Sequence, residues 1–199
     1  MEWIILLIVI AGLGFWVVKI YNTLVSYKTQ YENAFAQIDV QLKRRLDLIP
    51  NLVDVAKRYM EHERDTLLKV TEARSEMAQA LKQAEKMPGS QAAMKQLATA
   101  EATLNNAMAG FNIRVEAYPD LKANENMQQL SEELVSTENR IAYARQGFND
   151  LVQKFNEYRR SFPPIFIASM LGFKEDAALL EFSESRQELN TAPKDLFGS

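Results

Sequence analysis

Several residue types are absent or scarce in this 199-residue chain, and each scarcity excludes a class of site. The chain has no cysteine, which excludes disulfides, thiolate zinc sites, iron–sulfur clusters and cysteine nucleophiles. Its single histidine, His62, is not followed one turn later by the second histidine of a zinc-protease helix, because position 66 is Thr66. A di-iron bundle would need glutamate three residues before the histidine, where Tyr59 stands. We therefore expect no metal site and no cofactor.

Other hallmarks of chemistry are missing as well. The sequence contains no glycine-rich phosphate loop and no nucleophile elbow. Lysine and arginine number 23 against 26 aspartates and glutamates, with both signs interspersed, so no basic stripe is available for nucleic-acid phosphates. We expect no catalytic residues, no enzyme activity and no nucleic-acid partner. Paired buried carboxylates with perturbed titration would be the sign of an unrecognised enzyme.

Glycine and proline are also scarce, with seven and six copies, and the prolines fall where long helices would join. Pro50 is expected to separate a first helix from a second, residues 87–90 to form a turn, Pro119 to end a third helix, and Pro163 with Pro164 to end a fourth. This spacing predicts an all-α fold, an antiparallel bundle of about four long helices. The expected helix caps are Asp47, Ser90 and Asn124.

Apolar residues recur at helical spacing in each of these segments. The final long segment shows the clearest pattern, alternating steps of three and four from Met127 to Phe162. The third segment repeats every seven residues from Leu97 to Tyr118, with Glu101 as a polar interruption. The first segment continues the pattern at Tyr31, Phe35, Ile38, Leu42, Leu46 and Ile49, and the second at Val53, Ala56, Met60, Leu67, Val70, Met77 and Leu81.

The longest apolar run extends from Trp3 to Val18. Continued to Tyr21, it would be about 28 Å long as a helix, close to the hydrocarbon thickness of a bilayer. A cleaved signal peptide would start with basic residues and end with small ones, and this run is apolar on every side, so a retained transmembrane anchor is favoured over a signal peptide or a helix buried in a soluble core. Its expected interface residues are Trp3, Trp16, Lys19 and Tyr21.

The anchor and the bundle are expected to share one rigid helix. No glycine-, serine- or proline-rich linker follows the anchor, and a helix from Trp3 to Ile49 would be about 70 Å long. Basic residues occur only after the run, beginning with Lys19 and Lys28, which predicts a single-pass protein of the inner membrane with its bundle in the cytoplasm. The expected division is a transmembrane anchor over 1–21, a helical bundle over 22–162, and an apolar strap with a C-terminal tail over 163–199.

Charged residues cluster in two places, one where the first two helices are expected to meet and the other on the fourth helix. Ion pairing that sets helix register is the simplest interpretation of both clusters, a partner-binding surface the second, and catalysis the third. Arg140 is expected to pair with a carboxylate of another helix. The candidate network comprises Asp39, Arg44, Arg45, Asp47, Glu133, Glu138 and Arg140.

The segment from Phe162 to Phe173 is too apolar for an ordinary loop. Three interpretations stay open: a strap that closes the bundle, a contact between subunits, and insertion into a membrane surface. The candidate subunit-contact residues are Ile165, Phe166, Ile167, Met170, Leu171 and Phe173.

Four blocks together resemble the bacterial LemA family. They are Ile38 to Val53 (IDVQLKRRLDLIPNLV), Tyr118 to Asn124 (YPDLKAN), Glu132 to Ala142 with its TENRIA sequence, and Phe162-Pro163 followed by Gly172-Phe173. The resemblance covers almost the whole chain and implies a bacterial membrane protein with an N-terminal membrane helix and a helical bundle. It implies no catalytic residue, cofactor or substrate.

Two functions follow as hypotheses. The leading one is a membrane-anchored, self-associating helical scaffold or adaptor, and the alternative is a component of a transport or pore assembly. The uncharged, unbroken membrane helix makes the second less favoured. The expected partners are the lipid bilayer, further copies of the chain and, from the resemblance, another membrane protein such as a metalloprotease.

Overall fold

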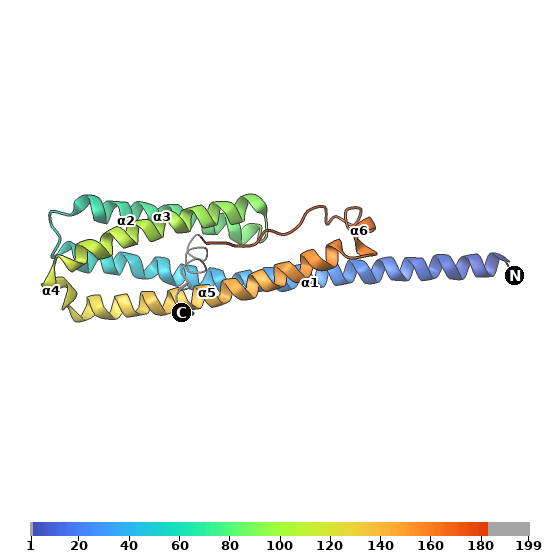
Figure 1. The fold of residues 1–199 in the computed structure, drawn as a ribbon, viewed down its shortest axis with the longest axis horizontal. Helices are drawn as coiled ribbons and strands as arrows, with labels where there is room; N and C mark the ends of the chain where they lie inside the picture. The colour runs from blue at the N-terminus through green and yellow to red at the C-terminus, as the bar shows by residue number, and fades with distance from the viewer. Residues whose placement is uncertain (1, 183–199) are drawn as a thin grey trace, which may run out of the picture.

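The structure is a computed structural model that describes residues 2–182. Within that range the chain forms helices and connecting loops, without a strand. The helices are α1 (Glu2–Lys57), α2 (Arg64–Lys86), α3 (Gln91–Glu116), α4 (Pro119–Lys122), α5 (Glu125–Arg160) and α6 (Pro164–Ile167) (Figure 1).

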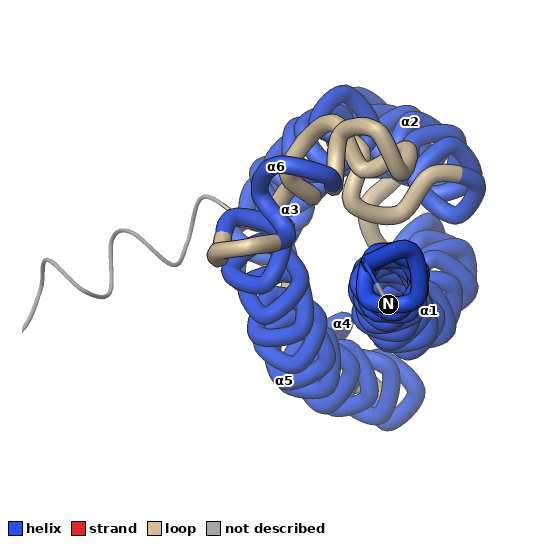
Figure 2. Tube along the Cα trace, turned by 90° about the vertical axis from the view of Figure 1, so that its right-hand side faces the viewer, coloured by secondary structure: helices blue, strands red, loops and turns tan. Residues whose placement is uncertain are grey.

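The four long helices α1, α2, α3 and α5 pack into an antiparallel bundle. Helix α5 lies along α1, and α2 lies along α3, with α2 also against α1 (Figures 1 and 2). The N-terminal part of α1 projects beyond the bundle at one end, while α4 closes the opposite end (Figure 1). The predicted all-α fold, with a long apolar helix that continues into a bundle, is confirmed.

The core consists of the side chains that helical periodicity selects. The six apolar residues predicted for the first helix, from Tyr31 to Ile49, are all buried. Phe35, Phe111 and Phe148 come from three different helices and are among the largest fully buried side chains. Aromatic edges join α1 to α5, since the ring of Tyr31 lies 5.4 Å from that of Phe155. Burial of these side chains is the main force that holds the bundle together.

Helix α1 does not end at Pro50, and the expectation that Pro50 separates two helices is wrong. The helix continues to Lys57, and the second helix begins only at Arg64. Proline has no backbone N–H, so the carbonyl of Leu46 loses its intrahelical donor. Arg74 of α2 supplies a replacement, because its Nε donates to that carbonyl oxygen at 2.7 Å. Asp47 is an exposed residue within α1 and caps no helix.

The other two predicted caps occupy the expected positions. Asn124 precedes α5, and its side-chain oxygen accepts a hydrogen bond from the backbone N–H of Met127 at 3.2 Å. Ser90 precedes α3 with extended backbone angles but makes no side-chain capping hydrogen bond. Both residues start a helix as the sequence predicts, one through its side chain and the other through its backbone conformation alone.

Gly89 occupies the turn between α2 and α3 with a φ of +79°, in the left-handed region. A Cβ atom there would lie 3.1 Å from both the Cβ of Ala177 and the ring of Tyr31. Glycine is needed for the backbone conformation and also for the close approach of the C-terminal segment. The expected turn over residues 87–90 is present.

The projecting part of α1 is the one helix in the described chain that is long and apolar enough to cross a membrane, by length and composition. Its side chains are exposed from Trp3 to Phe15 and beyond, and burial begins at Ile20 and Leu24, which are 3% and 0% exposed. The boundary between the exposed apolar part and the bundle therefore lies close to the expected end of the anchor at residue 21.

Candidate functional site

Arg45 on α1 is a deeply buried charged group of the bundle, with a side chain that is 4% exposed. Its guanidinium donates to Glu101 of α3, which is equally buried, and to Asn105 Oδ1 on the same helix at 2.6 Å. A further bond reaches Glu138 Oε1 of α5 at 3.1 Å. One planar cation thus holds three helices in a single register.

A charge buried this deeply is stable only while its partners remain in place. The carboxylate of Glu101 satisfies Arg45 from the interior, whereas Glu138, with its side chain 53% exposed, meets it from the solvent side. Arg145 closes the outer edge, with its guanidinium 4.9 Å above the ring of Phe182. A cavity of about 100 Å³ beside these groups is too small for a substrate and fits at most a few waters. The arrangement is suited to fixing helix positions.

Three other members of the predicted network, the buried Asp39 and the exposed Arg44 and Glu133, form ion pairs apart from Arg45. Asp39 accepts a hydrogen bond from Lys43 Nζ at 2.7 Å, and Lys43 also reaches Glu85 of α2 at 3.5 Å. The hydrogen bond that Lys43 donates to the Asp39 carboxylate raises the pKa of Lys43. Arg44 pairs with Glu133 of α5 at 3.7 Å, with both side chains about half exposed.

Two members of the predicted set join no ion pair with residues 2–182, namely Asp47 and Arg140. Asp47 points away from the bundle on α1. The expected ion pair between Arg140 and another helix's carboxylate is not formed within the described chain. Arg140 instead lines a groove between α1 and α5.

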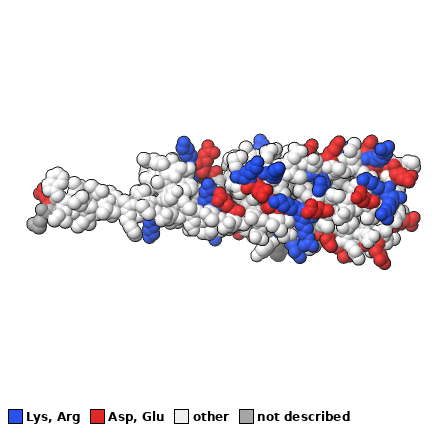
Figure 3. All heavy atoms as spheres, turned by 180° about the vertical axis from the view of Figure 1, so that it is seen from behind, with Lys and Arg blue, Asp and Glu red and all other residues white. Residues whose placement is uncertain are grey.

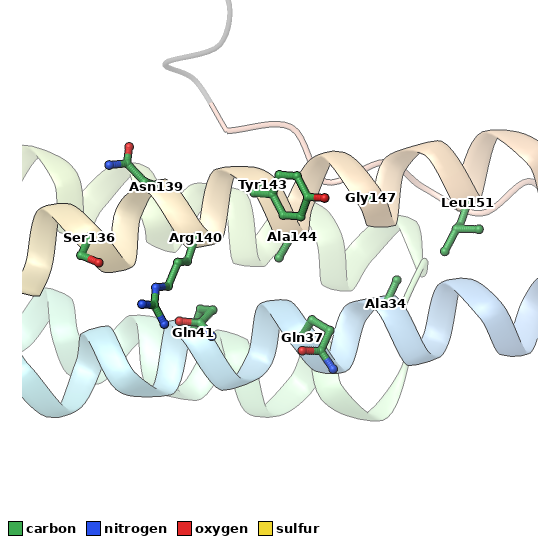
Figure 4. Close-up of a pocket in the computed structure, with 10 residues that line it drawn as sticks. All are labelled: Ala34, Gln37, Gln41, Ser136, Asn139, Arg140, Tyr143, Ala144, Gly147 and Leu151. Atoms are coloured by element: carbon green, nitrogen blue, oxygen red, sulfur yellow. The ribbon is translucent and has the colours of Figure 1, made fainter.

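This α1–α5 groove has a volume of about 600 Å³ and is open to solvent. Figure 4 shows the Arg140 side chain extending from α5 toward α1, where Gln41 lies opposite. Gln41 Oε1 is buried without a hydrogen-bond partner in the described chain. Small residues form the other half of the groove. Its lining is Ala34, Gln37, Gln41, Ser136, Asn139, Arg140, Tyr143, Ala144, Gly147 and Leu151.

Two asparagines of α5 clamp the segment that returns from α6 along the bundle. Asn156 accepts from the backbone N–H of Ala177 at 2.8 Å and donates to its carbonyl at 2.9 Å. Asn149 makes the same pair of bonds to Leu180, at 2.9 and 3.1 Å. Seven residues of helix and three residues of extended chain both advance about 10 Å, so the two clamps match in spacing.

The returning segment is also fixed on its other side. The backbone N–H of Ala178 donates to the carbonyl of Gly89 at 2.7 Å, and Asp176 pairs with Arg159 and Arg160 at the end of α5. Ala177, Ala178, Leu180 and Phe182 are buried. The end of the predicted strap and the described start of the predicted tail, residues 174–182, therefore pack between α5 and the α2–α3 turn, and the tail from 183 lies outside the described residues.

The six candidate subunit-contact residues divide into two groups. Ile167, Leu171 and Phe173 pack against this chain's own core, and the Phe173 ring lies 6.1 Å from that of Tyr21. The other three are exposed: Ile165 by 51%, Phe166 by 71% and Met170 by 85%. A subunit contact at these positions stays a prediction.

The predicted interface residues of the anchor lie along the projecting helix. Trp3 is 78% exposed near the end of the helix, and Trp16, Lys19 and Tyr21 lie where it enters the bundle. Tyr21 faces Phe173, so the base of the anchor is in contact with the segment after α6.

The predicted site left out four polar residues: two that bind Arg45 and two that bind the segment after α6. Glu101 was visible as a polar interruption of an otherwise apolar heptad repeat, and that position is a signal of a buried ionic partner. Asn105 follows it by one turn on the same face. Asn149 and Asn156 carry a heptad spacing that matches the core seam, but nothing in the sequence indicates their backbone partners.

No group of three or more metal-ligating side chains occurs within residues 2–182. His62 lies exposed in the connection between α1 and α2. The geometry defines a class of protein: a helical bundle held by an internal ion network, with one N-terminal helix of membrane-spanning length and composition.

The comparisons with known proteins place this chain in a family. The sequence matches the LemA family over residues 34–194, and the chain belongs to that family, as its motifs predict. It is 27% identical over 167 residues to magnetosome protein MamQ of Magnetospirillum gryphiswaldense, covering 75% of this chain and 61% of that protein. It is 26% identical over 172 residues to protein LemA of Metamycoplasma hominis, covering 86% and 74% respectively.

A MamQ protein of Paramagnetospirillum magneticum is 25% identical over 169 residues, which cover 77% of this chain and 62% of the relative. The chain thus spans about three fifths of the length of these MamQ relatives. The likeness extends over the bundle and supports a membrane-associated protein of this family.

Proposed function

We propose that this protein is a non-enzymatic, membrane-anchored scaffold that self-associates through the α1–α5 groove. The observation that carries this proposal is the continuity of α1, which is one 56-residue helix from the exposed apolar end to the bundle core. Such a helix is about 84 Å long. A bilayer that holds its first turns would fix the height above the membrane of everything packed against its last turns.

Copies anchored in this way would present the same surface at the same height above the bilayer. Confinement in the membrane plane raises their effective concentration and removes much of the orientational cost of association. The groove suits a helix of a neighbouring copy because Ala144 and Gly147 allow close approach. Its rim offers the Tyr143 ring, which is 81% exposed, and its floor offers the cation of Arg140 and the unpartnered Gln41 oxygen.

Two glycines allow a matched test of the groove. A Cβ atom added to Gly147 in the groove or to Gly110 on α3 meets nothing within 4 Å, so a side chain at either position starts in open space. The masses of the full chain, Gly147→Trp and Gly110→Trp would be measured by native mass spectrometry in mild detergent and in nanodiscs.

We expect a discrete oligomer for the full chain and for Gly110→Trp, and smaller species for Gly147→Trp. A full chain that is monomeric at all concentrations would remove self-association from the proposal, and the anchored adaptor would then be tested by partner capture. An oligomer that Gly147→Trp leaves intact would place the contact on another surface.

The proposal includes an inner-membrane location with the bundle on the cytoplasmic side, supported by Lys19 and Lys28 after the apolar run. The absence of native cysteine makes this directly measurable. Ile113 is 70% exposed on α3, so Ile113→Cys offers an accessible thiol on the bundle. A membrane-impermeant maleimide should label it only after the cells are opened. Labelling of this cysteine in intact cells would contradict the proposed orientation and place the bundle outside the cytoplasm.

A further inference from the structure

An exposed apolar patch lies beside the base of the anchor. It is defined by Phe162, Ile165, Phe166 and Met170, whose side chains are 80%, 51%, 71% and 85% exposed. The rings of Phe162 and Phe166 meet edge to face at 6.0 Å. Exposed apolar side chains of this size in one place mark an interaction surface.

The position of the patch follows from what the rest of its segment contacts. Phe173 touches Tyr21 on α1 and Phe155 on α5, with ring centroids 6.1 and 6.0 Å apart. Tyr21 lies at the level where α1 changes from exposed to buried. Figure 1 shows α6 beside that level, at the bundle end from which the anchor projects, and in Figure 2 both are on the viewer's side.

The chemistry of the segment fits a bilayer interface. Residues 161–172 contain no charged side chain, and basic residues flank them at Arg159, Arg160 and Lys174, with both arginines also paired to Asp176. Figure 3 shows the same transition on the surface, where the projecting helix and the adjoining end of the bundle are mostly white and charges of both signs cover the remainder. Apolar tips between basic flanks are typical of segments that lie in the headgroup region.

We propose that the patch inserts into the bilayer interface as a second membrane contact. This inference rests on the proposed function, because it requires that the anchor spans a bilayer. The anchor sets the depth: Ile20 and Leu24 are already within the bundle, so a bilayer that covers α1 as far as Val18 also reaches α6. A partner protein at this level would have to displace lipid, and for that reason lipid is the occupant that the geometry favours over a second copy.

Two contacts would constrain the molecule more than one. A single membrane helix can rotate about its axis and tilt. When a patch beside the helix also inserts into the bilayer, the rotation of the molecule about that axis is restricted. The α1–α5 groove would then face along the membrane plane in a fixed direction, as lateral association between copies requires.

The test uses single cysteines in the full chain, labelled with an environment-sensitive fluorophore. Phe166→Cys and Met170→Cys report on the patch, and Ile113→Cys is the control, an exposed apolar position at the far end of the bundle. Val9→Cys reports independently on the anchor. Each protein is reconstituted into phosphatidylcholine vesicles with a minority of phosphatidylglycerol, with quenching by doxyl lipids compared against quenching by aqueous iodide.

We expect doxyl lipids labelled near the headgroup to quench positions 166 and 170 several-fold more than position 113, with iodide showing the reverse order. Adding Met170→Asp should reduce lipid quenching at position 166, and adding Ile113→Asp should not. If iodide quenches position 166 as strongly as position 113 while lipid quenches position 9, the patch does not insert into the bilayer. The anchor would then still span the membrane, and only the second contact would be contradicted.

Two other results are also decisive. Protection at position 166 from both iodide and doxyl lipid would identify a protein contact and overturn the lipid assignment. Absence of lipid quenching at position 9 would contradict the anchor itself, and the proposed function would fail together with this inference.

Discussion

Arg74 donates a hydrogen bond from Nε to the carbonyl oxygen of Leu46 at 2.7 Å, and that carbonyl is the one that Pro50 leaves without an intrahelical donor. A side chain of α2 thereby replaces the hydrogen bond that α1 lacks at its only internal proline. This replacement lets one helix run from the apolar N-terminal end to Lys57.

A double-mutant cycle can measure how much the hydrogen bond from Arg74 to Leu46 contributes to the free energy of unfolding. Arg74→Ala should lower the free energy of unfolding by about 1 kcal/mol, because the Leu46 carbonyl loses its donor. In a Pro50→Ala background the backbone N–H of residue 50 takes over, so the same substitution should cost clearly less. Chemical unfolding followed by circular dichroism gives both values. Equal costs in the two backgrounds would show that Arg74 acts through something other than this carbonyl.

Arg45 and its neighbour Arg44 provide a comparison between a buried and an exposed cation. Arg45→Met should lower the free energy of unfolding by about 3–5 kcal/mol, because the buried carboxylate of Glu101 is left without its cation. Arg44→Met should cost at most about 1 kcal/mol, since its pair with Glu133 is exposed. Combining Arg45→Met with Glu101→Leu should recover stability relative to Arg45→Met alone. Similar costs for the two arginines would contradict the role assigned to the network.

The asparagine clamps predict a local effect. Asn156→Ala removes both bonds to Ala177, so the amide protons of Ala177 and Ala178 should exchange several-fold faster while the core helices keep their protection. Asn156→Asp keeps an acceptor for the Ala177 N–H and should give a smaller change. Asn106→Ala, on the exposed face of α3, is the control and should leave exchange in the strap unaltered. Unchanged exchange in Asn156→Ala would mean that apolar packing alone holds the strap.

Tyr31 should give the bundle a sensitivity to high pH. Burial of the phenol, aided by the nearby Glu32 carboxylate, raises the pKa of Tyr31 to about 12 from its ordinary 10.0. Because the folded pKa is the higher one, the stabilisation is complete below pH 10 and is lost as the pH rises from 10 to 12. Difference absorbance of tyrosinate should show a late ionisation that Tyr31→Phe removes. If Tyr31→Phe unfolds at alkaline pH with the same profile as the unmodified chain, ionisation of Tyr31 is not the cause of the pH sensitivity.

Local patterns in the sequence were enough to predict the helical elements, their core faces and the exposed apolar run. Helical periodicity selects the buried side of each helix because one face must leave water, which is a property of spacing along the chain. The turn at residues 87–90 and the caps at Ser90 and Asn124 are equally local. The same reasoning was wrong at Pro50, because the donor to the Leu46 carbonyl comes from Arg74, which lies 28 positions after Leu46 in the chain.

The candidate site was predicted only in part. Sequence clustering selected Arg45 and Glu138, which do meet, and placed Asp47 and Arg140 with them, which do not. Glu101 was noted as a polar interruption, yet its partner depended on the relative rotation of α1 and α3. Which charges pair across helices depends on how the helices are turned and staggered, and sequence spacing does not specify that.

By itself, the sequence determined an all-α chain, a helix of membrane-spanning length and apolar composition, and membership of the LemA family. These properties depend on residue order within single segments and on similarity along the chain. Only the tertiary structure decided that α1 passes unbroken through Pro50, that Arg45 holds three helices together, and that the exposed residues of the α6 segment lie beside the base of the anchor. Each of these brings residues far apart in sequence into contact, because packing of whole helices, and not local preference, fixes which distant groups meet.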